Sequence, residues 1–163
     1  MKKRFISYLS QYRYNVAFYC LVIVAAILLN RYIIGIAFVQ GPSMENTLTD
    51  KQVVWLYRWK PNIHNGDIII TNKNNPFDSN LIKRVISMEG QHLQIKNGTI
   101  WLDNKKLDEP YLKEQEWQSD MIDIIMPKNH AYILGDNRNQ SRDSREIGCI
   151  PISDIIGKVI FIN

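Results

Sequence analysis

The hydrophobic pattern divides this 163-residue chain into two unequal parts. Residues 16–29 (VAFYCLVIVAAILL) have no polar group except the hydroxyl of Tyr19, and a second apolar run covers residues 32–39. Beyond Gly41 the apolar residues come in short β-branched or aromatic runs separated by turn residues, with little 3.6-residue periodicity. The pattern predicts one apolar N-terminal helix followed by a mainly β body.

Several runs in the body have the composition of strands. They cover residues 53–57, 67–71, 83–87, 92–95, 99–102, 122–126, 131–134 and 155–162. Asn97-Gly98 is typical of a type I′ hairpin turn, and Asp103-Asn104 predicts a second tight turn. The polar stretch 113–120 is compatible with either a loop or a short helix. We expect an antiparallel β-sheet or β-barrel as the folded domain.

The first apolar run is short for a membrane span. A helix from Tyr14 to Leu29 would be about 24 Å long, and a run of this length also fits a buried helix or a signal-peptide core. A signal peptide needs a small-x-small cleavage site after its core, and neither LNRYI nor IGIAF supplies one. Tyr12, Tyr14 and Tyr32 are placed for the membrane interfaces, and Arg31 can extend its charge past the far one. We interpret the segment as an uncleaved membrane anchor.

The net charge of +4 comes from the N-terminal end. Residues 1–13 carry four basic residues and no acidic one, and the rest of the chain has sixteen of each sign. Positive charge on this flank keeps it in the cytoplasm. We therefore expect a cytoplasmic tail over residues 1–13, a transmembrane anchor over 14–31 and an extracytoplasmic β domain over 32–163. Because the folded body has no basic excess, nucleic acid is not an expected partner.

Cysteine and histidine are too few and too scattered to suggest a disulfide framework or a metal site. Cys20 and Cys149 are more than a hundred residues apart. His64, His92 and His130 occur singly, without the spacing of a two-histidine metal motif. We expect no metal and no cofactor.

Three segments of the body hold polar residues that could carry chemistry. Residues 41–48 (GPSMENTL) place Ser43 in a turn directly after the apolar part, although such a serine is ordinarily just a turn residue. Lys83 and Arg84 are adjacent in a β-type run, so one of them points inward unless the strand is a charged edge strand. Residues 135–148 (GDNRNQSRDSREIG) suit either a solvated loop or a hydrogen-bonded support around a site.

Taken in order, these segments resemble the boxes of the type I signal peptidases, the membrane-bound leader peptidases of bacteria. The matching boxes are VQGPSMENTL, GDIIITN, IKRVISMEG, KKLDEPYL and GDNRNQSRDSREIG. The single anchor and compact body are similar to the short members of Gram-positive bacteria. The resemblance implies a serine endopeptidase of the bacterial cytoplasmic membrane that contacts lipid and removes signal peptides from secreted preproteins after a small-x-small motif such as Ala-x-Ala.

The resemblance also implies a Ser-Lys dyad, with Ser43 as nucleophile and Lys83 as general base. No histidine lies in these boxes, so another base must activate the serine hydroxyl. A lysine with its ordinary pKa near 10.4 is protonated at neutral pH, so Lys83 needs an apolar surrounding that lowers its pKa. The candidate wall residues are Val39, Leu48, Leu81 and Ile82.

The polar loop supplies the supporting residues by the same resemblance. Ser141 would hydrogen-bond the amine of Lys83, and Asp143 would pair with Arg145 to fix the loop. Further candidates around the dyad are Asp136 and Arg84.

Oxyanion and substrate contacts are expected close to the serine. The backbone N–H of Ser43 is the expected oxyanion donor. Some members add a serine hydroxyl two positions earlier, where this chain has Gly41, so a second donor stays open. The expected substrate-binding residues are Val39, Gln40, Gly41, Met44, Leu48, Leu81 and Ile82. Candidates for lipid contact are Met44, Trp55, Tyr57 and Trp59, with core packing as an alternative for the three aromatic residues.

Two other interpretations are compatible with parts of the pattern. Ser-Lys sites also occur in self-cleaving repressors and in mitochondrial inner-membrane peptidases, but a repressor needs a DNA-binding domain where this chain has an apolar helix. A signal-peptidase-like helper, for example in pilus assembly, would cleave few or no general preproteins. Loss of Ser43 or Lys83 would mark a helper without hydrolysis, and both residues are present.

Overall fold

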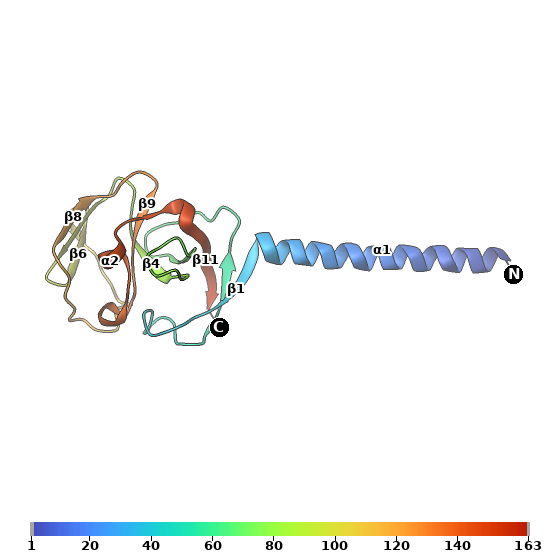
Figure 1. Ribbon diagram of the computed structural model, residues 1–163, viewed down its shortest axis with the longest axis horizontal. Coiled ribbons are helices and arrows are strands. Elements are labelled where there is room, and N and C mark those ends of the chain that lie inside the picture. The colour runs from blue at the N-terminus through green and yellow to red at the C-terminus, as the bar shows by residue number, and fades with distance from the viewer. Residues whose placement is uncertain (1, 163) are drawn as a thin grey trace.

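The computed structural model describes the backbone of residues 2–162 and the side chains of residues 12–29 and 31–160. Figure 1 shows one long helix standing away from a β body. In chain order the elements are α1 (Lys2–Tyr32), β1 (Ile34–Phe38), β2 (Val53–Tyr57), β3 (Ile68–Thr71), β4 (Ile82–Met88), β5 (His92–Lys96), β6 (Thr99–Leu102), β7 (Lys105–Lys106), β8 (Ile122–Ile125), β9 (His130–Leu134), η1 (Arg138–Gln140), α2 (Ser144–Ile147), β10 (Ile150–Pro151), η2 (Ile152–Asp154) and β11 (Ile155–Ile162).

Helix α1 has no partner within the folded body along its apolar part. The window Tyr12–Leu29 is long and apolar enough to cross a membrane, and none of it is buried. An apolar helix exposed on all sides is favourable only in an apolar surrounding. The helix begins at Lys2, so residues 2–13 of the predicted tail belong to the same helix, and the boundaries of tail and anchor stay a prediction.

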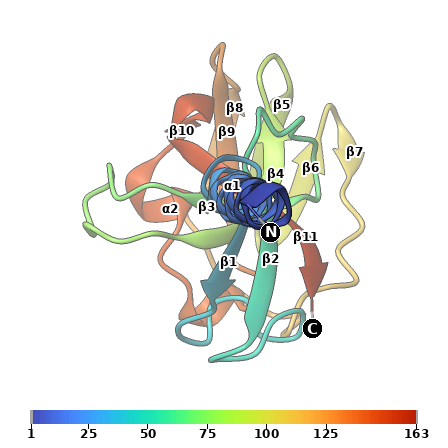
Figure 2. The same cartoon turned by 90° about the vertical axis from the view of Figure 1, so that its right-hand side faces the viewer.

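The body consists of two antiparallel sheets. The larger has seven strands in the order β1-β2-β11-β3-β4-β9-β10, and the smaller has four in the order β7-β6-β5-β8. Strand β4 lies inside the larger sheet, between β3 and β9, and the chain turns directly from β4 into β5 of the smaller sheet. Figure 2 looks along α1 and shows β1 and β2 next to its inner end. The mainly β, antiparallel body after one apolar helix is confirmed.

All the predicted strand runs form strands, and both predicted turns are present. Asn97 and Gly98 have φ of 48° and 69°, and Asp103 and Asn104 have φ of 51° and 64°. These left-handed pairs close the hairpins β5–β6 and β6–β7. Residues 113–120 form neither helix nor strand, so of the two structures expected for them the loop is found.

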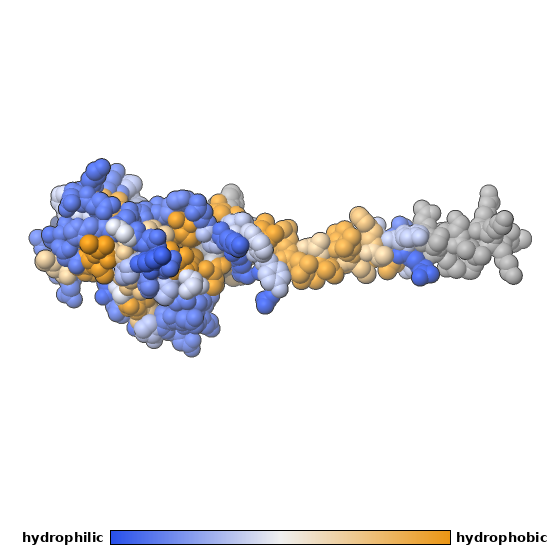
Figure 3. All heavy atoms as spheres, turned by 90° about the horizontal axis from the view of Figure 1, so that it is seen from above, coloured by the Kyte–Doolittle hydropathy of each residue, from blue (hydrophilic) through white to orange (hydrophobic). Residues whose placement is uncertain are grey.

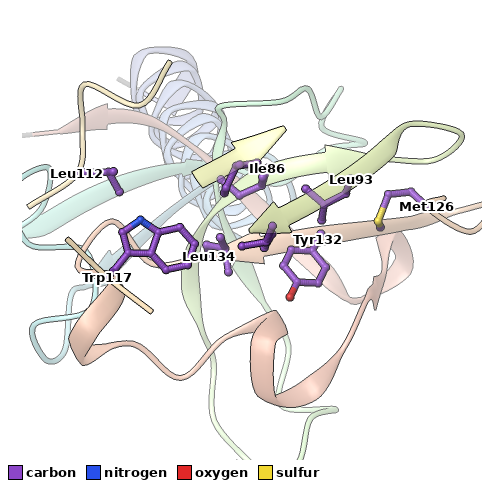
Figure 4. Close-up of a cluster of buried hydrophobic side chains, with 9 residues drawn as sticks. Ile86, Leu93, Leu112, Trp117, Met126, Tyr132 and Leu134 are labelled. Carbon is purple, nitrogen blue, oxygen red and sulfur yellow. The ribbon is translucent and has the colours of Figure 1, made fainter. Parts of the chain in front are cut away.

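Buried apolar side chains form three clusters around β4. One lies beneath the smaller sheet and is drawn in Figure 4, where most of its residues are labelled; it comprises Ile86, Leu93, Ile95, Ile100, Leu112, Trp117, Met126, Tyr132 and Leu134. The second joins the serine turn to the larger sheet and comprises Val39, Met44, Leu48, Val54, Leu56, Ile68 and Ile70. The third comprises Ile63, Ile69, Val85, Ala131, Ile133, Ile150 and Ile155. The inner strand β4 therefore passes through well-packed surroundings that fix the position of its side chains.

Candidate active site

Ser43 lies in a turn that is fixed at its two ends and along its apolar side. The ends are joined by two backbone hydrogen bonds between Val39 and the segment 51–52, each 2.9 Å long. Met44 and Leu48 are 1% and 0% exposed, so they hold the turn on the second apolar cluster. The half-buried Ser43 is thereby presented beside β4 by side chains that cannot leave the core without a large loss of burial.

Lys83 extends from the middle of the larger sheet toward Ser43. Its side chain is buried, with 4% of the residue exposed. Because β4 is an inner strand, the alternative of a charged edge strand is excluded. The Nζ atom of Lys83 donates to Ser43 Oγ at 2.6 Å and to the carbonyl of Ile82 at 3.0 Å. The structure thus brings the predicted base and nucleophile into direct contact.

Burial lowers the pKa of Lys83 to about 8. Loss of hydration is the largest cause; the carboxylates of Asp143 and Asp136 act in the opposite direction, and Arg145 adds a smaller lowering effect. At pH 7 about one amine in ten is then uncharged. An uncharged amine in hydrogen-bond contact with a hydroxyl can accept its proton, which is the step a nucleophilic serine needs.

Of the residues predicted as an apolar wall for Lys83, three are buried and Ile82 is half-buried. Val39 and Leu48 belong to the second cluster, and Ile82 packs against it from β4. Leu81 is also buried, with 9% of it exposed. Val39, Leu48 and Leu81 therefore offer little surface to a substrate in this structure, whereas Ile82 is partly accessible.

The loop after β9 is organised around the buried carboxylate of Asp143. It accepts hydrogen bonds from Arg145 Nε at 2.8 Å, from Arg145 Nη2 at 2.9 Å and from the backbone N–H of Gly135 at 3.1 Å. Arg145 also donates to the carbonyls of Arg138 and Ser141, at 2.7 and 3.2 Å. The predicted pair Asp143–Arg145 is present, and it ties both ends of the loop together.

A second buried carboxylate connects this loop to the serine turn. Asp136 accepts from Arg84 Nε at 2.8 Å and Nη2 at 2.7 Å, and from Thr47 Oγ1 at 2.5 Å. The guanidinium of Arg84 also lies 3.9 Å from the ring centroid of Tyr111. Asp136 and Arg84 therefore lie beside the site as predicted, while Thr47 and Tyr111 are partners that sequence patterns did not reveal.

Two further contacts hold the serine turn from outside. The backbone N–H of Asn137 donates to the carbonyl of Ser43 at 3.1 Å, and Asn46 Nδ2 donates to the carbonyl of Leu112 at 3.2 Å. Asn46 has a φ of 86°, a left-handed conformation that asparagine tolerates better than most residues. An asparagine in a turn is common, so the sequence carries no signal for this role.

The hydroxyl of Ser141 differs from the prediction. It is buried and has no hydrogen-bond partner among the described residues, so the expected bond to Lys83 is not formed. The reason is its direction: Ser141 Oγ lies 2.2 Å from the place that a Cβ on Gly135 would occupy. The side chain therefore faces Gly135 across the loop.

The surface around Ser43 is formed by fewer of the predicted residues than expected. Gln40 is exposed, and Gly41 is half-buried, so both are accessible to a bound peptide. Met44 is buried in the core, so the lipid contact predicted for it is wrong.

Trp55 and Trp59, two of the other residues expected to contact lipid, are 40% and 54% exposed.

A free donor is available for an oxyanion. In the described part of the chain, the backbone N–H of Ser43 donates no hydrogen bond. A negative oxygen that develops on a carbonyl attacked by Ser43 would lie close to this N–H, as an oxyanion donor requires. Gly41 offers no side chain for a second donor.

Comparison with known proteins gives a consistent result for sequence and fold. A family model described as "Signal peptidase, peptidase S26" matches residues 12–163. Signal peptidase IB of Staphylococcus aureus is 32% identical, covering 90% of this chain and 83% of the relative. Signal peptidase I of Bacillus licheniformis is 28% identical, covering 86% and 82%. The crystal structure of a signal peptidase I from Enterococcus faecalis shares the fold, with a TM-score of 0.52, 22% identity, and coverage of 62% of this chain and 98% of that one. The chain therefore belongs to the signal peptidase family, peptidase S26.

Proposed function

We propose that this type I signal peptidase cleaves secreted preproteins with Ser43 as nucleophile and Lys83 as general base, after a small-x-small motif. The observation that carries the proposal is the 2.6 Å contact between Lys83 Nζ and Ser43 Oγ, made by a buried lysine whose pKa is lowered to about 8. Ser43 is the only hydroxyl to which the Lys83 amine donates among the described residues. This contact supplies the nucleophile and the base in one place.

The reaction consists of two steps, acylation of Ser43 and hydrolysis of the acyl-enzyme. Lys83 Nζ and Ser43 Oγ take part in both. The uncharged Lys83 amine takes the proton of Ser43 Oγ while Oγ bonds to the scissile carbonyl carbon, and the Ser43 N–H stabilises the resulting oxyanion. The Lys83 ammonium then gives its proton to the departing amine of the mature protein, which leaves an acyl-enzyme ester. Lys83 next takes a proton from water, whose oxygen attacks the ester; the signal peptide leaves as a carboxylic acid and Ser43 regains its proton.

The site fits an extended peptide with small side chains near the scissile bond. The walls close to Ser43 are side chains already packed in the core, and the accessible rim is formed by Gln40, Gly41 and half-buried Ile82. Because these walls are already packed, we expect alanine-sized residues to fit beside Ser43 better than large ones. This supports cleavage after Ala-x-Ala.

The membrane arrangement follows from the helix and its charge. The window Tyr12–Leu29 spans the cytoplasmic membrane, the basic N-terminus stays inside, and the β domain lies outside. Only Ile33 separates α1 from β1, so the body starts directly at the outer membrane surface. A signal peptide crossing the same membrane presents its cleavage site on that side.

Incubation with a preprotein at several pH values tests the proposal. The purified chain in detergent should release a mature protein that begins directly after Ala-x-Ala, and it should leave a matched preprotein with Leu-x-Leu intact. Because only uncharged Lys83 is a base, kcat/KM should rise with pH and level off above a midpoint of about 8. Between pH 6 and pH 7 the increase should be about tenfold. Cleavage that is equally fast at pH 6 and pH 9 would contradict the lysine base.

The lack of a side chain at position 135 should be essential for cleavage. An alanine Cβ at Gly135 would lie 2.4 Å from the carbonyl oxygen of Ser43 and 2.2 Å from Ser141 Oγ. The Ser43 carbonyl is backbone, so the nucleophile must move, and a displacement near 1 Å costs about 100-fold in rate. We expect Gly135→Ala to lose about that factor in kcat.

Gly90→Ala is the matched control for this variant. Gly90 has open space around its missing Cβ, with nothing within 4 Å, but a φ of +79°. The alanine there should cost stability of about 1 kcal/mol without touching the site. Rates are measured per folded molecule, and equal rates for the two variants would refute the role of Gly135.

A further inference from the structure

Arg58 occupies an unusual place at the junction of helix and body. It follows β2, and its backbone N–H donates to the carbonyl of Ile33, the residue between α1 and β1, at 2.8 Å. Its guanidinium lies flat on Gly35, where a Cβ would be 2.3 Å from Nε. On the other side its Cγ is 3.6 Å from the Cβ position of Gly157. Gly35 on β1 thus makes room for the guanidinium, and the stem of Arg58 is in ordinary contact distance of Gly157 on β11.

The guanidinium of Arg58 has no partner in the described part of the chain. Its Nε is buried without a hydrogen-bond partner, and no described carboxylate pairs with the side chain. The acid near this end of the sheet, Asp67, already pairs with Lys158 at 2.7 Å and accepts from the backbone N–H of His64. Arg58 is half-buried, its buried Nε lacks an acceptor, and no described carboxylate offsets its charge, so an anion from outside the chain would be stabilising here.

With the window Tyr12–Leu29 placed across the membrane as proposed, Arg58 lies at the height of the lipid headgroups. The apolar window ends at Leu29, and Ile33 lies four residues further, or about 6 Å along a helix axis. The polar layer on each side of the hydrocarbon core is about 5–7 Å thick. Tyr32 and Trp59 are 56% and 54% exposed at the same level, as is typical of aromatic residues at a membrane interface.

Other charges at the junction have the same sign. Arg31 and Lys60 are exposed, Arg31 at the end of α1 and Lys60 two residues after Arg58. Figure 3 shows hydrophilic residues where the apolar part of the helix meets the body. A planar guanidinium with two flanking cations suits a phosphate diester.

We propose that Arg58, assisted by Arg31 and Lys60, binds the phosphate of an anionic lipid in the outer leaflet. The inference rests on the proposed membrane placement of α1. Because Arg58 is held between two strands of the larger sheet, a lipid bound there fixes how the body is turned about the axis of α1. It thereby fixes where the Ser43 site faces the membrane.

Lipid retention by the full chain tests this site. Native mass spectrometry in detergent with added phosphatidylglycerol should show one lipid retained by the wild type, and about tenfold weaker retention by Arg58→Gln. Lys106→Gln, on the exposed strand β7, removes one charge far along the chain and should retain lipid like the wild type. Equal retention by Arg58→Gln and the wild type overturns the proposal.

Further arms distinguish a bound anionic lipid from a neutral lipid and from a soluble phosphate. Phosphatidylcholine should be retained at least tenfold more weakly than phosphatidylglycerol, and equal retention overturns the charge argument. Displacement of the lipid by an equal concentration of glycerol phosphate would assign the site to a soluble phosphate and overturn the lipid proposal. If Arg58→Gln does not fold, Arg58→Lys replaces it, because lysine keeps the charge but lacks the planar set of N–H donors of a guanidinium. Arg58→Lys should retain lipid several-fold more weakly than the wild type. Retention equal to the wild type overturns the site. Retention does not depend on proteolysis, so a negative result here leaves the Ser43–Lys83 proposal standing.

Discussion

Replacing Lys83 with methionine should abolish preprotein cleavage and, at pH 7, raise the free energy of unfolding. Loss of the general base costs about 10³-fold or more in rate, because the Ser43 hydroxyl keeps its proton. Stability rises because methionine fills a similar volume without a charge that the fold must bury. The pKa of Lys83 falls from its ordinary 10.5 to about 8, which corresponds to roughly 3 kcal/mol between the folded and unfolded protein.

The pH dependence of this gain has a definite sign. Since the pKa of Lys83 is lower in the folded state, the unfolded chain binds more protons between about pH 8 and pH 10.5. The wild type therefore gains stability as the pH rises through this window. Lys83→Met has no such group, so its advantage should be full at pH 7 and shrink toward pH 10.5.

Denaturant unfolding of both proteins at pH 7, 8.5 and 10 measures the effect. Ser43→Ala is the matched control, because it also loses cleavage but keeps the buried lysine, so it should follow the pH dependence of the wild type. A stability difference between Lys83→Met and wild type that stays constant from pH 7 to pH 10 would show that burial does not lower the lysine pKa.

Local patterns were sufficient to predict most of the fold. Strand runs such as 53–57 and 99–102 were predictable because alternation and turn residues act over a few positions. Strand β1 was missed because its residues continue the apolar run of the helix, and only pairing with β2 makes them a strand. The position of β11 between β2 and β3 depends on contacts about a hundred residues apart, which no local pattern contains.

In the site, too, residues within sequence motifs were predictable, and residues whose role depends on contacts between distant segments were not. Ser43, Lys83, Asp143 and Arg145 were predictable because their boxes resemble a known family. Thr47 was not, since its role depends on a carboxylate 89 positions away. The direction of Ser141 Oγ is set by the close approach of the loop to Gly135, which depends on packing rather than on spacing in the sequence.

Removing the carboxylate of Asp136 should lower the free energy of unfolding far more than removing an exposed carboxylate of the same polar loop. The Asp136 side chain is 0% exposed and that of its partner Arg84 only 11%. Asp136→Ala leaves the Arg84 charge and the Thr47 hydroxyl without their shared acceptor. Breaking one partner of a buried pair costs about 3–5 kcal/mol, a large part of the stability of a small domain. We expect a loss of this size in denaturant unfolding, together with a loss of cleavage, because the same loop holds the Ser43 carbonyl through Asn137.

Glu146→Ala tests whether burial of the ion pair is the reason for the large loss of stability expected of Asp136→Ala. It breaks another arginine–carboxylate pair of the same loop, Arg142–Glu146 at 3.3 Å, whose side chains are 66% and 48% exposed. Water and salt screen such a pair, so its loss should cost less than about 1 kcal/mol. The double variant Asp136→Ala with Arg84→Met removes the uncompensated charge and should regain part of the loss. Equal losses for Asp136→Ala and Glu146→Ala, or no recovery in the double variant, would mean that the buried charge of Arg84 is not what makes Asp136 necessary.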